Sequence, residues 1–67
     1  MSRKNSVGVE FAKKWTTTIL ASSDRDKMVD RIVKEEGYRR KATITRVANV
    51  HSAFKKGELT KDGIWLV

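Results

Sequence analysis

Apolar and polar residues alternate along the segment that follows a polar N-terminus, and this alternation predicts a strand over residues 14–21. The strand would carry Trp15 and Ile19 on one face. Three successive threonines favour it, because β-branched side chains lose rotamer freedom in a helix. A competing pattern places Phe11, Trp15 and Ile19 along one side of a helix.

The next segment, residues 22–37, has the spacing of an amphipathic helix. Ser22 or Ser23 would accept hydrogen bonds from the first free amides, and Gly37 would end the helix in the left-handed conformation. Four apolar residues form one stripe along this helix: Met28, Val29, Ile32 and Val33. This stripe predicts a face packed on the core.

Residues 38–54 fit two patterns. The run Thr-Ile-Thr-Arg-Val favours a strand, and no Ser, Thr, Asp or Asn stands before Ala42 to cap a helix. We therefore predict a strand, with a bulge near residues 46–48. The alternative is a helix with one stripe formed by six residues: Thr43, Ile44, Val47, Val50, His51 and Phe54.

The C-terminal segment predicts a hairpin, because Asp62-Gly63 is a turn dipeptide and residues 64–67 form an apolar strand. Together the four elements predict an α+β fold with the order β-α-β-β, in which one helix packs on a small antiparallel sheet. The predicted core consists of Trp15, Ile19, Met28, Val29, Ile32, Val33, Ile44, Val50, Phe54, Leu59 and Trp65.

Size and composition restrict the class of protein. Sixty-seven residues suffice for one small domain, which we place at residues 9–67 behind a flexible basic arm over residues 1–8. The chain has no cysteine and a single histidine, so we expect no metal site, no cofactor and no enzymatic activity. It has no apolar run of about 20 residues and no signal peptide, so we expect no membrane contact and a cytoplasmic location.

A formal net charge of +7 makes a polyanion the expected partner. Residues 38–67 carry seven of the fifteen Lys and Arg residues but two acids. On the predicted sheet, threonines would line up with basic residues on the solvent face, and both would contact a nucleic acid. The candidate nucleic-acid-binding residues are Arg39, Arg40, Lys41, Lys13, Lys14, Thr16, Thr18, Thr43, Lys55 and Lys56.

The run KWTTTIL, followed by MVDRIVKEEG and ATITRVA, resembles the ribbon-helix-helix repressors of the Arc type. This resemblance implies an intertwined dimer whose paired strands enter the DNA major groove, with Lys14, Thr16 and Thr18 facing the bases. A winged helix is a further possibility, with KKGELTKDGIWLV as the wing, and it requires residues 10–22 to be helical.

These observations lead to two hypotheses of function. The first is a small regulatory protein that docks Lys and Arg on nucleic-acid phosphates, with DNA favoured over RNA. The second is a small inhibitor of the kind bacteriophages direct at host proteins, which would meet an acidic patch or add its last residues to a partner's sheet. That partner-binding segment would be Ile64, Trp65, Leu66 and Val67. A further hypothesis is a homodimer with a purely structural role.

Overall fold

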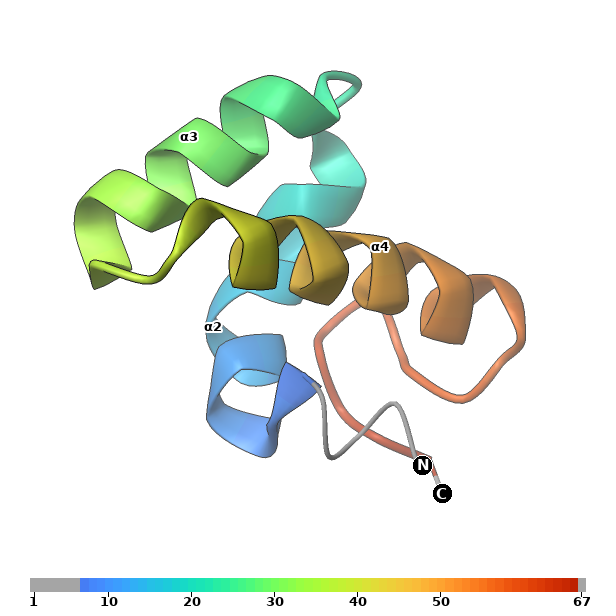
Figure 1. The fold of residues 1–67 in the computed structure, drawn as a ribbon. Coiled ribbons are helices and arrows are strands. Elements are labelled where there is room, and N and C mark those ends of the chain that lie inside the picture. The colour runs from blue at the N-terminus through green and yellow to red at the C-terminus, as the bar shows by residue number, and fades with distance from the viewer. Residues whose placement is uncertain (1–6, 67) are drawn as a thin grey trace.

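The structure, a computed structural model, describes residues 7–66 and contains three long helices in that range. They are α2 (Val9–Ala21), α3 (Arg25–Glu36) and α4 (Arg40–Lys55). Figure 1 shows α4 crossing in front of α2, with α3 above α4 in this view. The described residues form no sheet, so both the predicted α+β fold and its ribbon-helix-helix alternative are wrong.

Helix α2 replaces the strand predicted over residues 14–21. Three threonines cost a helix about 2 kcal/mol relative to alanine. Burial of a large apolar side chain contributes about 1.5–3 kcal/mol, and Phe11, Trp15 and Ile19 are all buried along one side of α2. Packing therefore outweighs the propensity of the threonines. The helix that a winged-helix arrangement requires in this region is present.

Helix α3 confirms the predicted amphipathic helix, with shorter ends than residues 22–37. Its N-cap is Asp24 rather than a serine, and the Asp24 carboxylate accepts from the amide of Lys27 at 3.2 Å. Ser22 supports this cap, since its hydroxyl accepts from the amide of Asp24. Gly37 ends the helix in the left-handed conformation, with φ of 72°, as predicted.

Helix α4 replaces the strand predicted within residues 38–54. Its N-cap, Arg39, supplies no side-chain hydrogen bond to the first turn. The amide of Thr43 donates to the Arg39 carbonyl in the first hydrogen bond of the helix, and the hydroxyl of Thr43 donates to the same oxygen, each at 3.0 Å. The buried residues of α4 recur at helical spacing: Thr43, Val47, Val50 and Ala53. The helical alternative for this segment is therefore correct.

A tight turn follows α4 and packs against α2. The Asp62-Gly63 turn is present, but the predicted terminal strand reduces to one antiparallel bridge between Leu59 and Trp65. The hydroxyl of Thr17 donates to the carbonyl of Lys61 at 2.9 Å, which ties α2 to the turn.

Most of the predicted core is confirmed. Seven of the predicted residues are buried, and Val33 and Trp65 pack against them while partly exposed. The prediction that Ile44 and Phe54 belong to the core is wrong, since 49% and 43% of their surfaces are exposed. Val7 is buried although it lies within the predicted arm, and residues 1–6 of that arm lie outside the described residues.

Candidate nucleic-acid interface

Helices α3 and α4 are joined by three residues, Gly37, Tyr38 and Arg39. The left-handed Gly37 reverses the chain, and α4 then packs against both α3 and α2 (Figure 1). A three- or four-residue turn that contains glycine is also the connection found between the two helices of a helix-turn-helix motif. In DNA-binding proteins built this way, the second helix lies in the major groove.

The turn is held by a stacked side chain. The guanidinium of Arg46 on α4 lies 4.3 Å from the ring centre of Tyr38 and 5.7 Å from that of Phe11 on α2. Such cation–π contacts favour a fixed orientation of the planar guanidinium. Arg46 therefore joins the turn to α2 and fixes the start of α4.

The side of α4 that faces away from the bundle carries small and basic residues. Five residues spaced by four, three, four and three positions share this side, and we call them the outward stripe: Lys41, Thr45, Ala48, Ser52 and Lys55. Ser52 is partly exposed and the other four are exposed. From Lys41 to Lys55 the stripe spans about 21 Å at 1.5 Å per residue.

The charge on this part of the chain has one sign. Residues 39–56 contain six Lys and Arg residues and none of the eight Asp and Glu residues. A segment with several positive charges and no acid of its own attracts a polyanion such as a nucleic acid.

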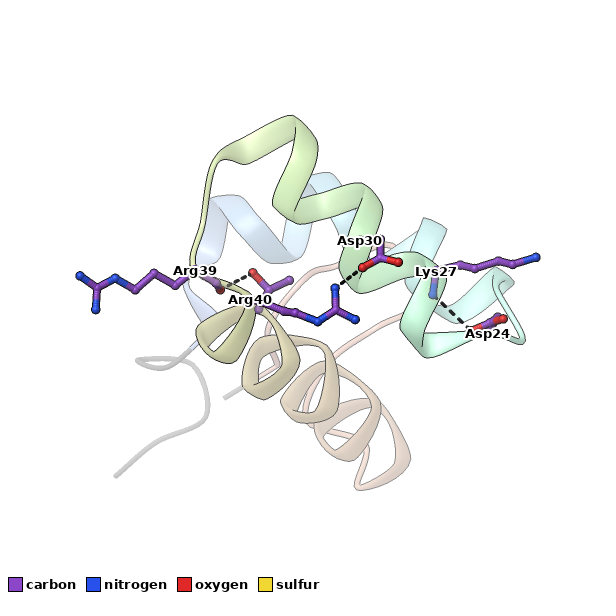
Figure 2. A network of polar contacts seen from close by, with 6 residues as sticks. Asp24, Lys27, Asp30, Arg39 and Arg40 are labelled. Carbon is purple, nitrogen blue, oxygen red and sulfur yellow. Dashed lines mark hydrogen bonds and ion pairs between the residues drawn. The ribbon is translucent and has the colours of Figure 1, made fainter.

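Two of the predicted cationic residues are paired with acids instead. Arg40 forms an ion pair with Asp30 on α3, and this hydrogen bond and charge raise the pKa of Arg40. Lys14 on α2 lies 2.5 Å from a carboxylate oxygen of Glu36, and the hydrogen bond raises the pKa of Lys14. Figure 2 shows that Arg40 turns toward Asp30, whereas Arg39 extends away from the helices.

The predicted threonine row does not form. Thr16 and Thr43 are fully buried, so neither side chain reaches a ligand at the surface, and Thr18 is partly exposed on α2. The reason is the helical periodicity of α2 and α4, which turns these positions toward the core.

The remaining predicted basic residues are divided between two places. Lys13 is exposed on α2, where its backbone lies against Gly63 of the C-terminal turn. Arg39, Lys41, Lys55 and Lys56 are exposed at the two ends of α4. The structure thus separates Lys13 from the basic residues around α4.

Sequence reasoning placed Thr45 and Asn49 on the solvent face of the predicted strand but did not name them as binding residues, and it left Ala48 and Ser52 off that face. A signal for them exists, because they recur with Lys41 and Lys55 at helical spacing and include no acid and no large apolar residue. The preference for a strand in this region hid that pattern.

The predicted partner-binding segment is partly exposed. Ile64 and Leu66 are exposed by 46% and 60%, whereas Trp65 packs against the core and Val67 lies outside the described residues. Binding of a host protein through this segment stays a prediction.

Comparison with protein-family models, curated proteins and solved structures finds no match to this chain. Between residues 7 and 66, no helix has the length and apolar character needed to cross a membrane. The same part of the chain has no group of three His, Asp or Glu side chains suited to a metal ion.

Proposed function

We propose that this protein binds double-stranded DNA without catalysis, by placing the outward stripe of α4 in the major groove. The observation that supports this proposal is the stripe itself, in which short side chains lie between Lys41 at one end and Lys55 at the other. The proposal extends to a regulatory role, since a protein that occupies DNA excludes or recruits others there.

The stripe suits a helix that approaches DNA closely. The major groove is about 12 Å wide and admits an α-helix. Thr45, Ala48 and Ser52 are short, so the backbone of α4 can lie near the base edges. Lys41 and Lys55 would reach the phosphates that border the groove, and Arg39 and Lys56 would extend those contacts at each end.

The proposal is tested by measuring affinity for a duplex DNA over a series of salt concentrations. Each phosphate neutralised should contribute a slope of about 0.9 in log affinity against log salt. The double variant Lys41→Ala, Lys55→Ala should reduce that slope by about two phosphates, that is, by about 1.8. A slope that is unchanged in this variant would contradict the placement of α4.

Lys13→Ala is the matched control, because it removes an exposed lysine from α2, next to the C-terminal turn. It should leave the salt slope of the wild type unchanged. If Lys13→Ala lowers the slope and the double variant does not, the interface lies on α2.

A second control compares the affinity for duplex DNA with that for a duplex RNA of the same sequence. The major groove of A-form RNA is deep and narrow and does not admit a helix. We expect weaker binding to duplex RNA than to duplex DNA at the same salt concentration. Equal affinity would indicate contact with the phosphates alone.

A further inference from the structure

The centre of the outward stripe and the residues at its edge offer groups that suit one kind of base pair. We infer that α4 recognises A·T base pairs beneath its central turns and that Asn49 reads adenine there. This inference rests on the proposed function, and it assigns the base preference of that same surface.

Asn49 is the one amide side chain in α4, and it is partly exposed at the edge of the outward stripe, one position after the exposed Ala48 and four before the buried Ala53. Among the described residues, its side chain has no hydrogen-bond partner. An Asn side chain donates to adenine N7 and accepts from adenine N6 in one planar, bidentate contact. Its free amide is therefore available for that contact.

The neighbours of Asn49 offer methyl groups. Ala42, Thr45 and Ala48 are exposed, and the Thr45 hydroxyl donates to the carbonyl of Lys41 at 3.2 Å within the helix. Because that hydroxyl proton is used inside the helix, the methyl group and an oxygen lone pair of Thr45 remain for the groove. Alanine and threonine methyl groups contact the C5-methyl group of thymine.

The centre of the outward stripe has no Arg or Lys side chain that could contact guanine. Arg and Lys read guanine through its O6 and N7 atoms. Arg46 is stacked on Tyr38, away from the outward stripe, and Arg40 is paired with Asp30, which leaves Lys41 at the start of the helix. Residues 41–49 span about 12 Å, or three to four base pairs at about 3.4 Å each.

The inference is tested by selecting bound duplexes from a pool with a randomised centre and then sequencing them. We expect enrichment of A·T pairs in the centre. The preferred duplex should bind wild type about tenfold more tightly than the same duplex with one central A·T pair replaced by G·C. The variant Asn49→Ala should lose most of that preference while it keeps the salt slope.

Lys13→Ala again serves as the control, because it changes an exposed polar side chain on α2, outside the outward stripe. It should keep the preference for A·T pairs. Far-UV circular dichroism of both variants shows whether the helices are retained.

The possible failures are distinct. Salt-dependent binding without an A·T preference overturns the base assignment and leaves DNA binding intact. A preference for A·T that survives Asn49→Ala overturns the role of Asn49. No binding of wild type to any duplex overturns both the inference and the proposed function.

Discussion

The indole nitrogen of Trp15 donates to a carboxylate oxygen of Glu36 at 3.0 Å, which ties the middle of α2 to the last residue of α3. Lys14 contacts the same oxygen from the position before Trp15. Glu36 is followed directly by Gly37, where the turn into α4 begins. This junction therefore fixes the end of α3 from which α4 departs.

The two donors to Glu36 make stability depend on pH. Two hydrogen bonds lower the pKa of Glu36 from its ordinary value of 4.5, and the bond from Lys14 has a larger effect than the bond from Trp15. A carboxylate with a lowered pKa stabilises the fold above that ordinary value, and the contribution is lost as the pH falls through the lowered pKa. We expect Glu36→Gln to lower stability at neutral pH and to make urea denaturation less pH-dependent in acid.

Glu35→Gln is the control for this prediction. It removes the same charge one position earlier, where the exposed carboxylate makes a 3.8 Å ion pair with Arg31. Exposed pairs of this kind contribute about 0–1 kcal/mol. If Glu35→Gln and Glu36→Gln changed the free energy of unfolding equally, the contacts of Lys14 and Trp15 with Glu36 would not contribute to stability.

The two buried threonines predict opposite responses to the same substitution. Thr16 and Thr43 are both fully buried, but the hydroxyl of Thr16 has no partner among the described residues, while that of Thr43 donates to Arg39. A buried polar atom without a hydrogen bond is costly. We expect Thr16→Val to stabilise the fold by about 1 kcal/mol and Thr43→Val to destabilise it by about 1 kcal/mol.

Chemical denaturation of the two variants measures this difference, and the wild type serves as reference. Because both side chains are buried, neither variant should change the affinity for duplex DNA. Destabilisation by Thr16→Val would mean that its hydroxyl is bonded in solution.

Alanine substitutions at Gly63 and Gly57 would separate the effect of backbone strain from that of steric overlap. Both have positive φ, 84° and 78°, which an L-residue adopts at a cost of about 1–2 kcal/mol. A Cβ atom at Gly63 would also overlap the carbonyl of Ala12 on α2, whereas a Cβ atom at Gly57 would meet nothing within 4 Å. We expect Gly63→Ala to destabilise the fold clearly more than Gly57→Ala.

Thermal unfolding of both variants tests this expectation. Equal losses would mean that the C-terminal turn does not rest on α2.

The one histidine gives a direct measure of burial on α4. Burial is the larger and the charge of Arg25 the smaller of two causes that lower the pKa of His51 below its ordinary value of 6.5. For a base whose pKa is lowered by folding, stability is complete above the ordinary value and falls as the pH drops below it. We expect the imidazole proton signals to titrate below pH 6.5 in an NMR experiment.

Arg25→Ala should raise the pKa of His51 part of the way toward its ordinary value, because burial would remain. A wild-type midpoint at or above 6.5 would contradict the partial burial of His51 in solution.

Local signals predicted the parts of the fold that depend on nearby residues. The apolar stripe and the left-handed Gly37 of α3 are set by residues within a few positions of one another, and so is the Asp62-Gly63 turn. The segments KWTTTIL and ATITRVA were predicted as strands but are helical, and the reason is the same for both. Their β-branched residues favour a strand locally, but helical packing buries Trp15 and Ile19 in one segment and Val47 in the other.

The candidate site was predicted in part. Its basic residues at the ends of α4 follow from charge alone, because Arg39, Lys41, Lys55 and Lys56 belong to the cationic part of the sequence. The inclusion of Thr16 and Thr43 depended on the strand assignment, and their burial removes them. Asn49 becomes a candidate once α4 is known to be a helix, since helical periodicity places it at the edge of the outward stripe, partly exposed.

The amino-acid order by itself determined the cationic surplus, most of the core residues and the one helix that has both an apolar stripe and a glycine at its C-terminal end. The tertiary structure decided that residues 9–21 and 40–55 are helices, and it decided which lysines and arginines remain free of acids. The physical reason is that burial of side chains from distant segments outweighs the small local preference of β-branched residues. Ion pairs such as that of Arg40 with Asp30 likewise require two helices to be packed together.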